Sequence, residues 1–463
     1  RLKFTTAKLA EAGPLFFRDL VVLDSVPNDI GVVAGIITAQ FQTPLSHINV
    51  LSQNRGTPNM ALTTALTNAS LKALDGSWVE LTVGPFDWKI REVTQQEADT
   101  WWDEHKPAAI SVPAMNVTVT ALTDIEDVLD MNLGLGPALA KAIPAFGGKA
   151  SHYGAFSHMN RDASGALVLH EDGRPVVPFP KAFAIPLFYY RQFMQDRGFD
   201  AKVDKMLADP LMDSDPVYRD QQLETLRDAM KAATIDAKLL AKVIAKLKAD
   251  FPGVRMRFRS STNAEDLDGF TGAGLYTSKS GDLNDPERPV DLAIKKVWAS
   301  IWTSRAFQER AWRSIDHRAV GMALLVHRSF PDEEANGVAL TANPFDTSGT
   351  ESAFFINVQV GEASVVLPDA GVTVDSFLYY YDHPGQKQTF LSHSSLLPAG
   401  QTVLDAAQTW RLGQALARVR AFFKPLYGSR SFYAMDVEFK LDGEPGQPPL
   451  LFVKQARPYG GGT

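Results

Sequence analysis

Short apolar runs alternate with turn residues along the first part of the chain. These runs cover Leu20–Leu23, Gly31–Thr38, Asn59–Thr63 and Ser77–Val83. Strand-length runs separated by helix-length segments predict a small β/α unit, which we assign to residues 1–93.

The pattern changes between residues 94 and 115, where acidic residues, tryptophans and scattered prolines replace the apolar runs. We interpret this segment as a connector. If about 20 of its residues were extended at roughly 3.3 Å each, it would reach some 65 Å. That reach would let one domain visit two sites on another.

The remainder, residues 116–463, is predicted to form a second domain with two subdomains, 116–320 and 321–463. Apolar residues recur at helical spacing over Asp220–Lys248 and again over Val290–Trp312. From Met322 onward the pattern favours strands, interrupted by a late helix. The expected strands are Met322–Ser329, Gly337–Thr341, Ala353–Val358, Tyr433–Leu441 and Leu450–Gln455, and the helix is Ala406–Phe423.

Composition narrows the possible chemistry. None of the 463 residues is cysteine, which excludes disulfides, cysteine-ligated metals and a thiol nucleophile. The chain has a net charge of −7 and contains no block of basic residues, so we expect no nucleic-acid partner. No apolar run approaches the roughly 18 residues that span a bilayer, so we expect no membrane contact. Position 1 is Arg and not Met, so we expect this chain to be an excised part of a longer polypeptide. A cytoplasmic location is a separate expectation.

His47 is the first candidate for chemistry. It follows Pro44 and Ser46, two residues that favour helix starts, so we predict His47 in the first turn of a helix running to about Asn54. A helix N-terminus favours an anion held near the imidazole, which suits a phosphorylated histidine. A surface or capping histidine is the alternative interpretation.

A second candidate combines alternating arginines with a glycine-bearing loop. Arg255, Arg257 and Arg259 share one face of a predicted strand, and hydroxyls and glycines follow over residues 260–274. Cations beside unhindered backbone N–H groups suit a polyphosphate. The glycine spacings of a P-loop or a dinucleotide fingerprint are absent. A purely structural arginine ladder is the alternative.

The third candidate lies on two predicted C-terminal strands. Asp436 and Glu438 are two residues apart and share a face, as do Gln455 and Arg457. Carboxylate and amide oxygens are the ligands of a hard cation such as Mg²⁺. Such a cation would bridge phosphate oxygens. Paired strand charges that are simply solvated are the alternative.

Taken in order, these segments resemble the dikinase family of pyruvate phosphate dikinase, phosphoenolpyruvate synthase and the plant glucan water dikinases. Arg259 through Leu267 resembles the family's nucleotide-loop motif, and Ser46-His47 is similar to its phosphohistidine motif. Further matching segments are Gly147-Gly148-Lys149, Gly337–Pro344, Asn357–Val366, Asp436–Glu438 and Gln455–Pro458. A histidine unit that precedes the nucleotide unit, with no barrel after it, is most similar to glucan water dikinases.

The resemblance implies an α/β and α+β multidomain protein: a swivelling phosphohistidine domain followed by an ATP-grasp-type nucleotide-binding domain. It implies Mg²⁺ and ATP, with the metal near Asp436, Glu438 and Gln455. The implied catalytic residues are His47, Arg259 and Arg457. The implied nucleotide-binding residues are Lys149, Ser260, Ser261, Glu265, Asp266, Val326, His327 and Glu362. The chain departs from the family at His327, where Gln is frequent, and at Leu45, where the pyruvate-linked enzymes carry Thr.

The function expected from this resemblance is an ATP-dependent dikinase. The β-phosphate of ATP would pass to His47 and on to an acceptor, for which an α-glucan is the first candidate, with release of AMP and phosphate. Trp78, Trp101 and Trp102 are candidates to stack on sugars, with internal packing as the alternative. Two other functions stay open: a pyruvate-linked synthase whose barrel lies elsewhere, and a nucleotide-binding regulator without catalysis. The oligomeric state is left open.

Overall fold

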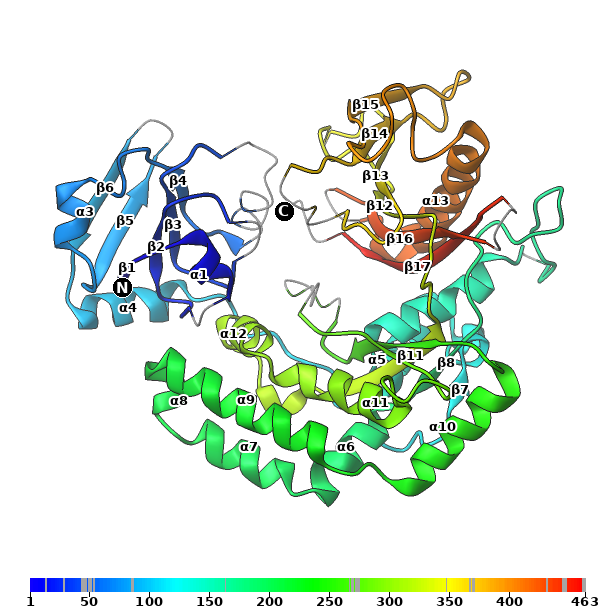
Figure 1. The fold of residues 1–463 in the computed structure, drawn as a ribbon, viewed down its shortest axis with the longest axis horizontal. Coiled ribbons are helices and arrows are strands. Elements are labelled where there is room, and N and C mark those ends of the chain that lie inside the picture. Colours follow the sequence, from blue (N-terminus) through cyan, green and yellow to red (C-terminus); the bar gives the residue numbers. More distant parts are fainter. Residues whose placement is uncertain are drawn as a thin grey trace.

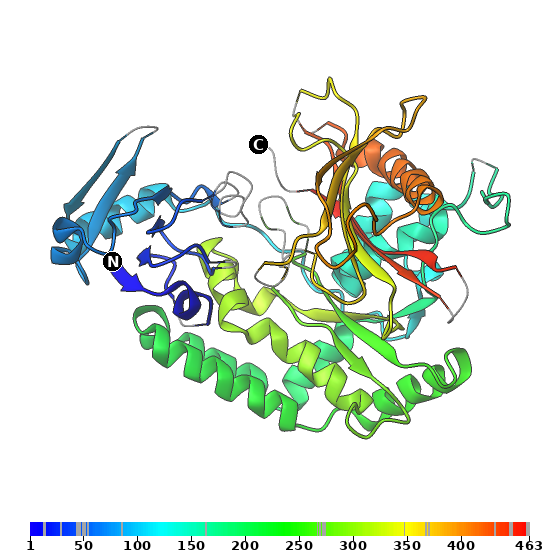
Figure 2. The ribbon, with the colours of Figure 1, turned by 45° about the horizontal axis from the view of Figure 1, so that its top comes forward.

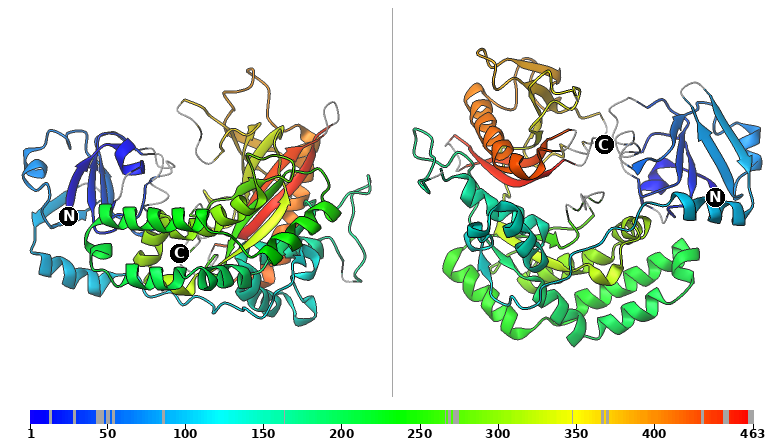
Figure 3. Two further views of the ribbon diagram at one scale, coloured as in Figure 1. Left: turned by 60° about the horizontal axis from the view of Figure 1, so that its bottom comes forward. Right: turned by 180° about the vertical axis from the view of Figure 1, so that it is seen from behind.

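A computed structural model describes the chain except residues 13–14, 28–29, 43–47, 49–51, 53–54, 85–86, 163, 266, 268–269, 271–274, 347, 366–367, 369–370, 430–431, 444–447 and 460–463. Figure 1 shows three units: an N-terminal sheet, a five-stranded sheet with a layer of helices, and a six-stranded sheet. Figures 2 and 3 show that the first and third units stand apart on the same side of the helical layer.

The N-terminal unit is built on a four-stranded parallel sheet in the order β1-β2-β3-β4. Its elements are β1 (Leu2–Thr5), α1 (Ala7–Ala12), β2 (Leu20–Leu23), β3 (Gly35–Thr38), β4 (Asn59–Ala61), α3 (Ala69–Ala73) and the hairpin β5 (Val79–Val83) and β6 (Trp88–Glu92). Separate apolar clusters cover its two faces, as the buried strands of a parallel sheet require. The apolar runs expected as strands contain β2, β3, β4 and β5, whereas β1 and β6 were not predicted.

The expected connector is not extended throughout. Its first half is helix α4 (Gln95–His105), which begins with a capping box in which Thr94 and Glu97 bond each other's backbone N–H groups. The prediction of an extended segment was wrong for these residues because acidic residues and tryptophans do not oppose a helix that starts with a strong cap. The prolines that break the pattern lie beyond the helix, at Pro107 and Pro113.

Among the described residues, the contacts of the N-terminal unit with the helical layer include an ion pair, a hydrogen bond from Arg219 of α9 (Pro216–Ala232) to Leu15 O, and a group of aromatic rings. Arg55 donates to Glu309 on α12 (Ser304–Trp312) at 2.6 Å. The ring of Trp102 lies 4.8 Å from that of Phe17 and 5.0 Å from that of Trp312, centre to centre. Trp102 is therefore used in packing rather than presented to a sugar. Figure 1 shows α12 beside this unit.

The five-stranded sheet has the order β10-β9-β11-β8-β7 and is antiparallel at every pairing. Its strands are β7 (Thr123–Asp124), β8 (Ala182–Ile185), β9 (Met256–Thr262), β10 (Lys279–Gly281) and β11 (Met322–Arg328). Its helices are α6 (Leu187–Asp196), α7 (Phe199–Leu207), α8 (Leu211–Ser214), α9 (Pro216–Ala232), α10 (Ala237–Asp250), α11 (Val290–Ala299) and α12. One buried apolar cluster joins these helices to the outer face of the sheet.

The six-stranded sheet is antiparallel in the order β15-β14-β13-β12-β16-β17. Its elements are β12 (Ala335–Leu340), β13 (Phe354–Val360), β14 (Asp375–Tyr379), β15 (Gln388–Ser392), α13 (Ala406–Tyr427), β16 (Met435–Asp442) and β17 (Leu450–Pro458). Helix α5 (Leu135–Met159) shares a core with both sheets. Because β11 pairs with β8 and β9, the division between the two sheets follows Arg328 and not residue 320. Within the described residues, no helix is long and apolar enough to cross a membrane.

Candidate functional site

Helix α5 places a lysine against the end of strand β9. Lys149 Nζ donates to Ser260 O at 3.0 Å and pairs with Glu265 Oε1 at 2.8 Å. Both side chains of this pair are nearly buried. Ser261 Oγ donates to Phe146 O at 2.7 Å and so fastens the helix to the strand. Four residues predicted from sequence therefore lie together, at Lys149, Ser260, Ser261 and Glu265, while Asp266 lies outside the described residues.

A break in α5 makes this contact possible. Gly147 has φ 77° and ψ 168° in the middle of the helix. A Cβ atom there would lie 2.2 Å from the backbone oxygen of Ser261. This combination of dihedral angles is essentially confined to glycine, and the close approach leaves no space for a side chain. The first glycine of the Gly147-Gly148-Lys149 motif is thus required by backbone geometry.

Gly147→Ala is expected to destabilise the protein by about 3 kcal/mol, because the dihedral strain and the steric overlap add. Urea unfolding followed by circular dichroism measures the change. Gly173→Ala is the matched control, since Gly173 also has a positive φ, of 79°, but nothing lies near its Cβ position. The control should cost about 1–2 kcal/mol from strain alone. Equal losses in the two variants would contradict the close approach at Gly147.

Strands β16 and β17 carry the second group of predicted residues. Asp436 pairs with Arg457 across the ladder and Glu438 with Gln455, so all four lie at neighbouring positions of the two strands. Met435, Val437 and Phe439 alternate with the two acids and enter the core. Arg457 donates to Asp436 Oδ2 from Nε at 3.0 Å and from Nη2 at 2.7 Å. The predicted common face of Asp436 and Glu438 is confirmed.

Arg259 joins the two sheets. From β9, its Nη2 donates to Glu438 Oε2 and to Gln455 Oε1, both at 2.8 Å, and its Nη1 donates to Lys454 O at 2.7 Å. The Arg259 side chain is almost fully buried, while a third of the Glu438 side chain is exposed. Two candidate groups that sequence analysis considered separately are therefore one site, in which Arg259 is the central residue.

The charges of the site strongly favour ionised Glu438. Burial would raise the pKa of this carboxyl, but Arg259, Lys454 and Arg457 outweigh burial and lower the pKa to about 2. For two lysines, in contrast, the surroundings disfavour the charged form. Burial and the nearby arginines lower the pKa of Lys440 to about 8 and that of Lys454 well below its usual range. Lys440 also forms an ion pair with the buried Glu333, and Lys149, Arg259 and Arg457 have acidic partners as well.

Sequence reasoning missed Lys440 and Lys454. Lys440 continues the alternation of Asp436 and Glu438 on β16, so the period of the strand could have found it. Lys454 could not be found this way. The register between β16 and β17 shifts after Glu438, where two residues of β17 stand opposite one of β16, and this bulge displaces Lys454 from simple alternation.

Strand β11 contributes His327 but not Val326 to this side of the sheet. His327 is fully buried, stacks on Tyr153 of α5 with ring centres 6.0 Å apart, and donates from Nδ1 to Arg328 O at 2.6 Å. Its Nε2 is buried without a hydrogen bond. Burial and the nearby Arg259 hold the pKa of His327 well below its usual range, so the ring is neutral. The Val326 side chain lies in the core on the opposite face.

Two predicted residues remain apart from this group. Glu362 is exposed in the turn after β13. Burial and Arg259 lower the pKa of Arg257, and Glu362 is near enough to raise it in part. His47 lies outside the described residues. Its neighbours Ile48 and Ser52 are helical, and Ser52 Oγ donates to Ile48 O at 2.5 Å.

The described residues contain no cluster of three or more His, Asp or Glu side chains that could hold a metal ion. Asp436, Glu438 and Gln455 nevertheless supply two carboxylates and an amide on adjacent strands, and Glu438 stays ionised at any ordinary pH. Oxygen donors of this kind fit a hard divalent cation that brings further ligands from a bound phosphate. The donor set is thus compatible with Mg²⁺ held jointly by protein and ligand.

Comparison with known families gives this geometry its context. Residues 143–461 match the model of the pyruvate phosphate dikinase AMP/ATP-binding domain. The chain belongs to this family. The match begins just before the kink in α5 and includes every described candidate residue of both sheets.

Curated relatives are phosphoenolpyruvate synthases. Those of Pseudomonas aeruginosa and Escherichia coli are 28% and 26% identical, each over 61% of this chain and 37% of the relative. The enzyme of Aeropyrum pernix is 25% identical over 44% of this chain and 24% of the relative. The chain therefore spans only about a quarter to two fifths of the length of these relatives.

Proposed function

We propose that this chain is an ATP-dependent dikinase that carries phosphate on His47. The observation that carries the proposal is the bridge from Arg259 to Glu438 and Gln455, which gathers cations and oxygen donors from two sheets at one place. Phosphoryl transfer depends mainly on positioned charges, and this site supplies them. The match to an AMP/ATP-binding domain family supports ATP as the ligand.

The proposed reaction begins with a neutral imidazole nitrogen of His47. The nitrogen attacks the β-phosphorus of ATP, an N–P bond forms, the bond between this phosphorus and the α,β-bridging oxygen breaks, and AMP leaves. Water then removes the γ-phosphate as inorganic phosphate. Lys149, Arg259 and Lys454 would exchange their present partners for phosphate oxygens. Asp436, Glu438 and Gln455 would hold Mg²⁺, which when bound neutralises part of the phosphate charge.

The experiment that tests this function is incubation of the protein with ATP labelled at the β- or the γ-position. AMP should form, and the β-label should stay on the protein after the γ-label has been released as phosphate. A nucleotide-binding regulator would form no AMP, and this result would overturn the proposal.

The acceptor that receives phosphate from His47 has two candidates. The order of the units supports an α-glucan, and Trp101 is exposed on α4, stacked on His105 at 4.4 Å, where a sugar could reach it. The names of the curated relatives support pyruvate instead. A screen of glucans, pyruvate and small alcohols with β-labelled ATP would separate the two.

Nucleotide binding near pH 8 is expected to take up protons. Burial and the nearby arginines lower the pKa of Lys440 to about 8, although it pairs with the buried Glu333, and a nearby phosphate would raise that pKa. Calorimetric titration with a non-hydrolysable ATP analogue in buffers of different ionisation enthalpy measures the uptake. Lys440→Met combined with Lys454→Met should remove most of it, whereas Lys238→Met, at an exposed position on α10, should not. Unchanged uptake in the double variant would contradict the placement of phosphates beside these lysines.

A further inference from the structure

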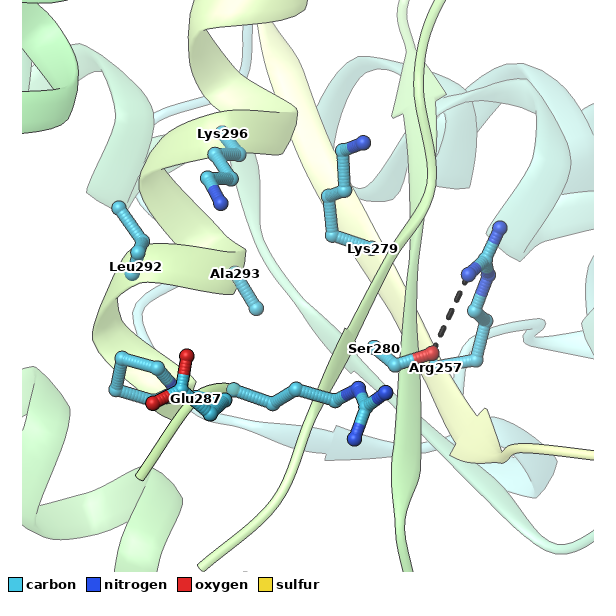
Figure 4. A pocket seen from close by; sticks show the side chains of 9 residues that line it. Arg257, Lys279, Ser280, Glu287, Leu292, Ala293 and Lys296 are labelled. Atoms are coloured by element: carbon cyan, nitrogen blue, oxygen red, sulfur yellow. Dashed lines mark hydrogen bonds between the residues drawn. The ribbon is translucent and has the colours of Figure 1, made fainter. Parts of the chain in front are cut away.

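A pocket lies at the free edge of the five-stranded sheet, outside the site described above. It has a volume of about 240 Å³ and is enclosed by β9, β10, the segment before α11 and the first turns of α11. Figure 4 shows Lys279 of β10 and Lys296 of α11 on either side of it, with Arg257 and Ser280 beyond the strand. No residue of β16 or β17 contributes to its lining.

Its lining is strongly basic. Four basic residues and one acidic residue, Glu287, line it; the basic residues are Arg257, Lys279, Arg288 and Lys296. Arg288 is neutralised by an ion pair with Asp285. In the part of the chain that the structure describes, neither the Lys279 nor the Lys296 side chain makes a hydrogen bond or an ion pair, although both side chains are partly buried. Gathering cations without counter-ions is unfavourable, and an anion between them would reverse that cost.

The start of helix α11 is a further feature that favours an anion here. Arg257 and Ser280, which are hydrogen-bonded at 3.3 Å, lie on the opposite face of the strands, because Ser280 pairs with Arg257 and Lys279 with Phe258. Helix α11 begins at the pocket with Pro289 as its N-cap, and no side chain caps its first N–H groups. Backbone N–H groups without partners and the positive end of the helix dipole add to the attraction of the lysines.

We propose that this pocket binds a small phosphate-bearing anion, with Lys279 and Lys296 as its principal contacts. The volume suits a ligand no larger than a pyrophosphate or a sugar phosphate, not a whole nucleotide. Arg257 lies two residues before Arg259 on the same face of β9, so the pocket and the nucleotide site share one strand. The inference rests on the pocket alone and stands whether or not the proposed dikinase reaction is correct.

The test uses the intact chain saturated with a non-hydrolysable ATP analogue, so that the nucleotide site is filled. Inorganic pyrophosphate and glucose 6-phosphate are titrated separately by calorimetry, to distinguish an inorganic from a sugar-borne phosphate. Lys279→Glu and Lys296→Glu are compared with Lys238→Glu, which makes the same charge change at an exposed position of α10. Binding of the ATP analogue to each variant is measured in parallel.

At least one of the two probes should bind the saturated wild type, and each pocket variant should weaken that binding about ten-fold or more. Lys238→Glu should leave it within two-fold, and analogue affinity should stay within two-fold in all variants. Absence of binding by both probes overturns the proposal. So does binding that Lys279→Glu and Lys296→Glu leave unchanged. Failure of the analogue to bind the wild type would count against the nucleotide site instead, and the probes are then titrated alone.

Discussion

His47→Ala should abolish the phosphoenzyme while leaving ATP binding nearly intact. The reason is chemical: a nitrogen nucleophile forms a phosphoramidate labile enough to pass its phosphate on, and His47 stands in the segment similar to the family's phosphohistidine motif. The cations proposed to hold ATP lie on other elements, in the two large sheets. Removing the imidazole should therefore remove the covalent step and spare the binding step.

Incubation with β-labelled ATP, followed by denaturation at alkaline pH, measures the phosphoenzyme directly. The expected loss exceeds 1,000-fold, the usual range for removal of a nucleophile. His105→Ala is the matched control, because His105 is an exposed histidine on α4, in contact with Trp101 and remote from the sheets. Label retained on His47→Ala would sink the assignment, and so would equal losses in both variants.

Arg259→Met should lower AMP formation by about 100- to 1,000-fold, the range found when one charge-stabilising group is removed from a preorganised site. The same change removes the three hydrogen bonds that the Arg259 side chain donates from β9 to β16 and β17. We therefore expect a loss of stability as well, on the order of 2 kcal/mol, since the partner Glu438 is partly solvated. Arg255→Met is the control, because Arg255 pairs only loosely with Asp282, at 3.8 Å.

The pH dependence of the free energy of unfolding separates the role of Arg259 in stability from its role in AMP formation. The pKa of Glu438 is about 2, below its ordinary 4.5, so the pair contributes stability above pH 4.5 that is lost as the pH falls towards 2. Arg259→Met should flatten this part of the stability profile, measured by urea unfolding at a series of pH values. Glu438→Gln should flatten it too, and the double variant should lose no more than either single variant. Additive losses would show that the two residues act separately.

The fold could be predicted from sequence wherever apolar spacing was regular. Strands β11, β13 and β16 fall within two residues of their predicted ranges, and α9 and α10 occupy the helical tract predicted over Asp220–Lys248, because their buried faces follow a strand or helical period. The strands β14 and β15 were missed. Their segments lie among glycines, prolines and polar residues, so their spacing alone carries little signal.

The candidate site could be predicted residue by residue but not as one arrangement. The positions of Arg259 and Glu438 follow from strand alternation, yet their contact depends on how two sheets approach each other through α5. The Lys454 bulge and the kink at Gly147 are local irregularities that no period predicts. The basic pocket was missed because its lysines come from a short edge strand and from a helix whose apolar stripe indicated only a core.

The helix in the connector changes the reach of the N-terminal unit. At about 1.5 Å per residue, the 11 residues of α4 span about 16 Å, less than half of their extended length. If the N-terminal unit delivers phosphate as proposed, such a short tether would hold it at an effective concentration on the order of millimolar. Under the proposed reaction, phosphorylation should therefore proceed at a rate independent of protein concentration. An N-terminal unit supplied as a separate chain would have to reach millimolar levels to compete.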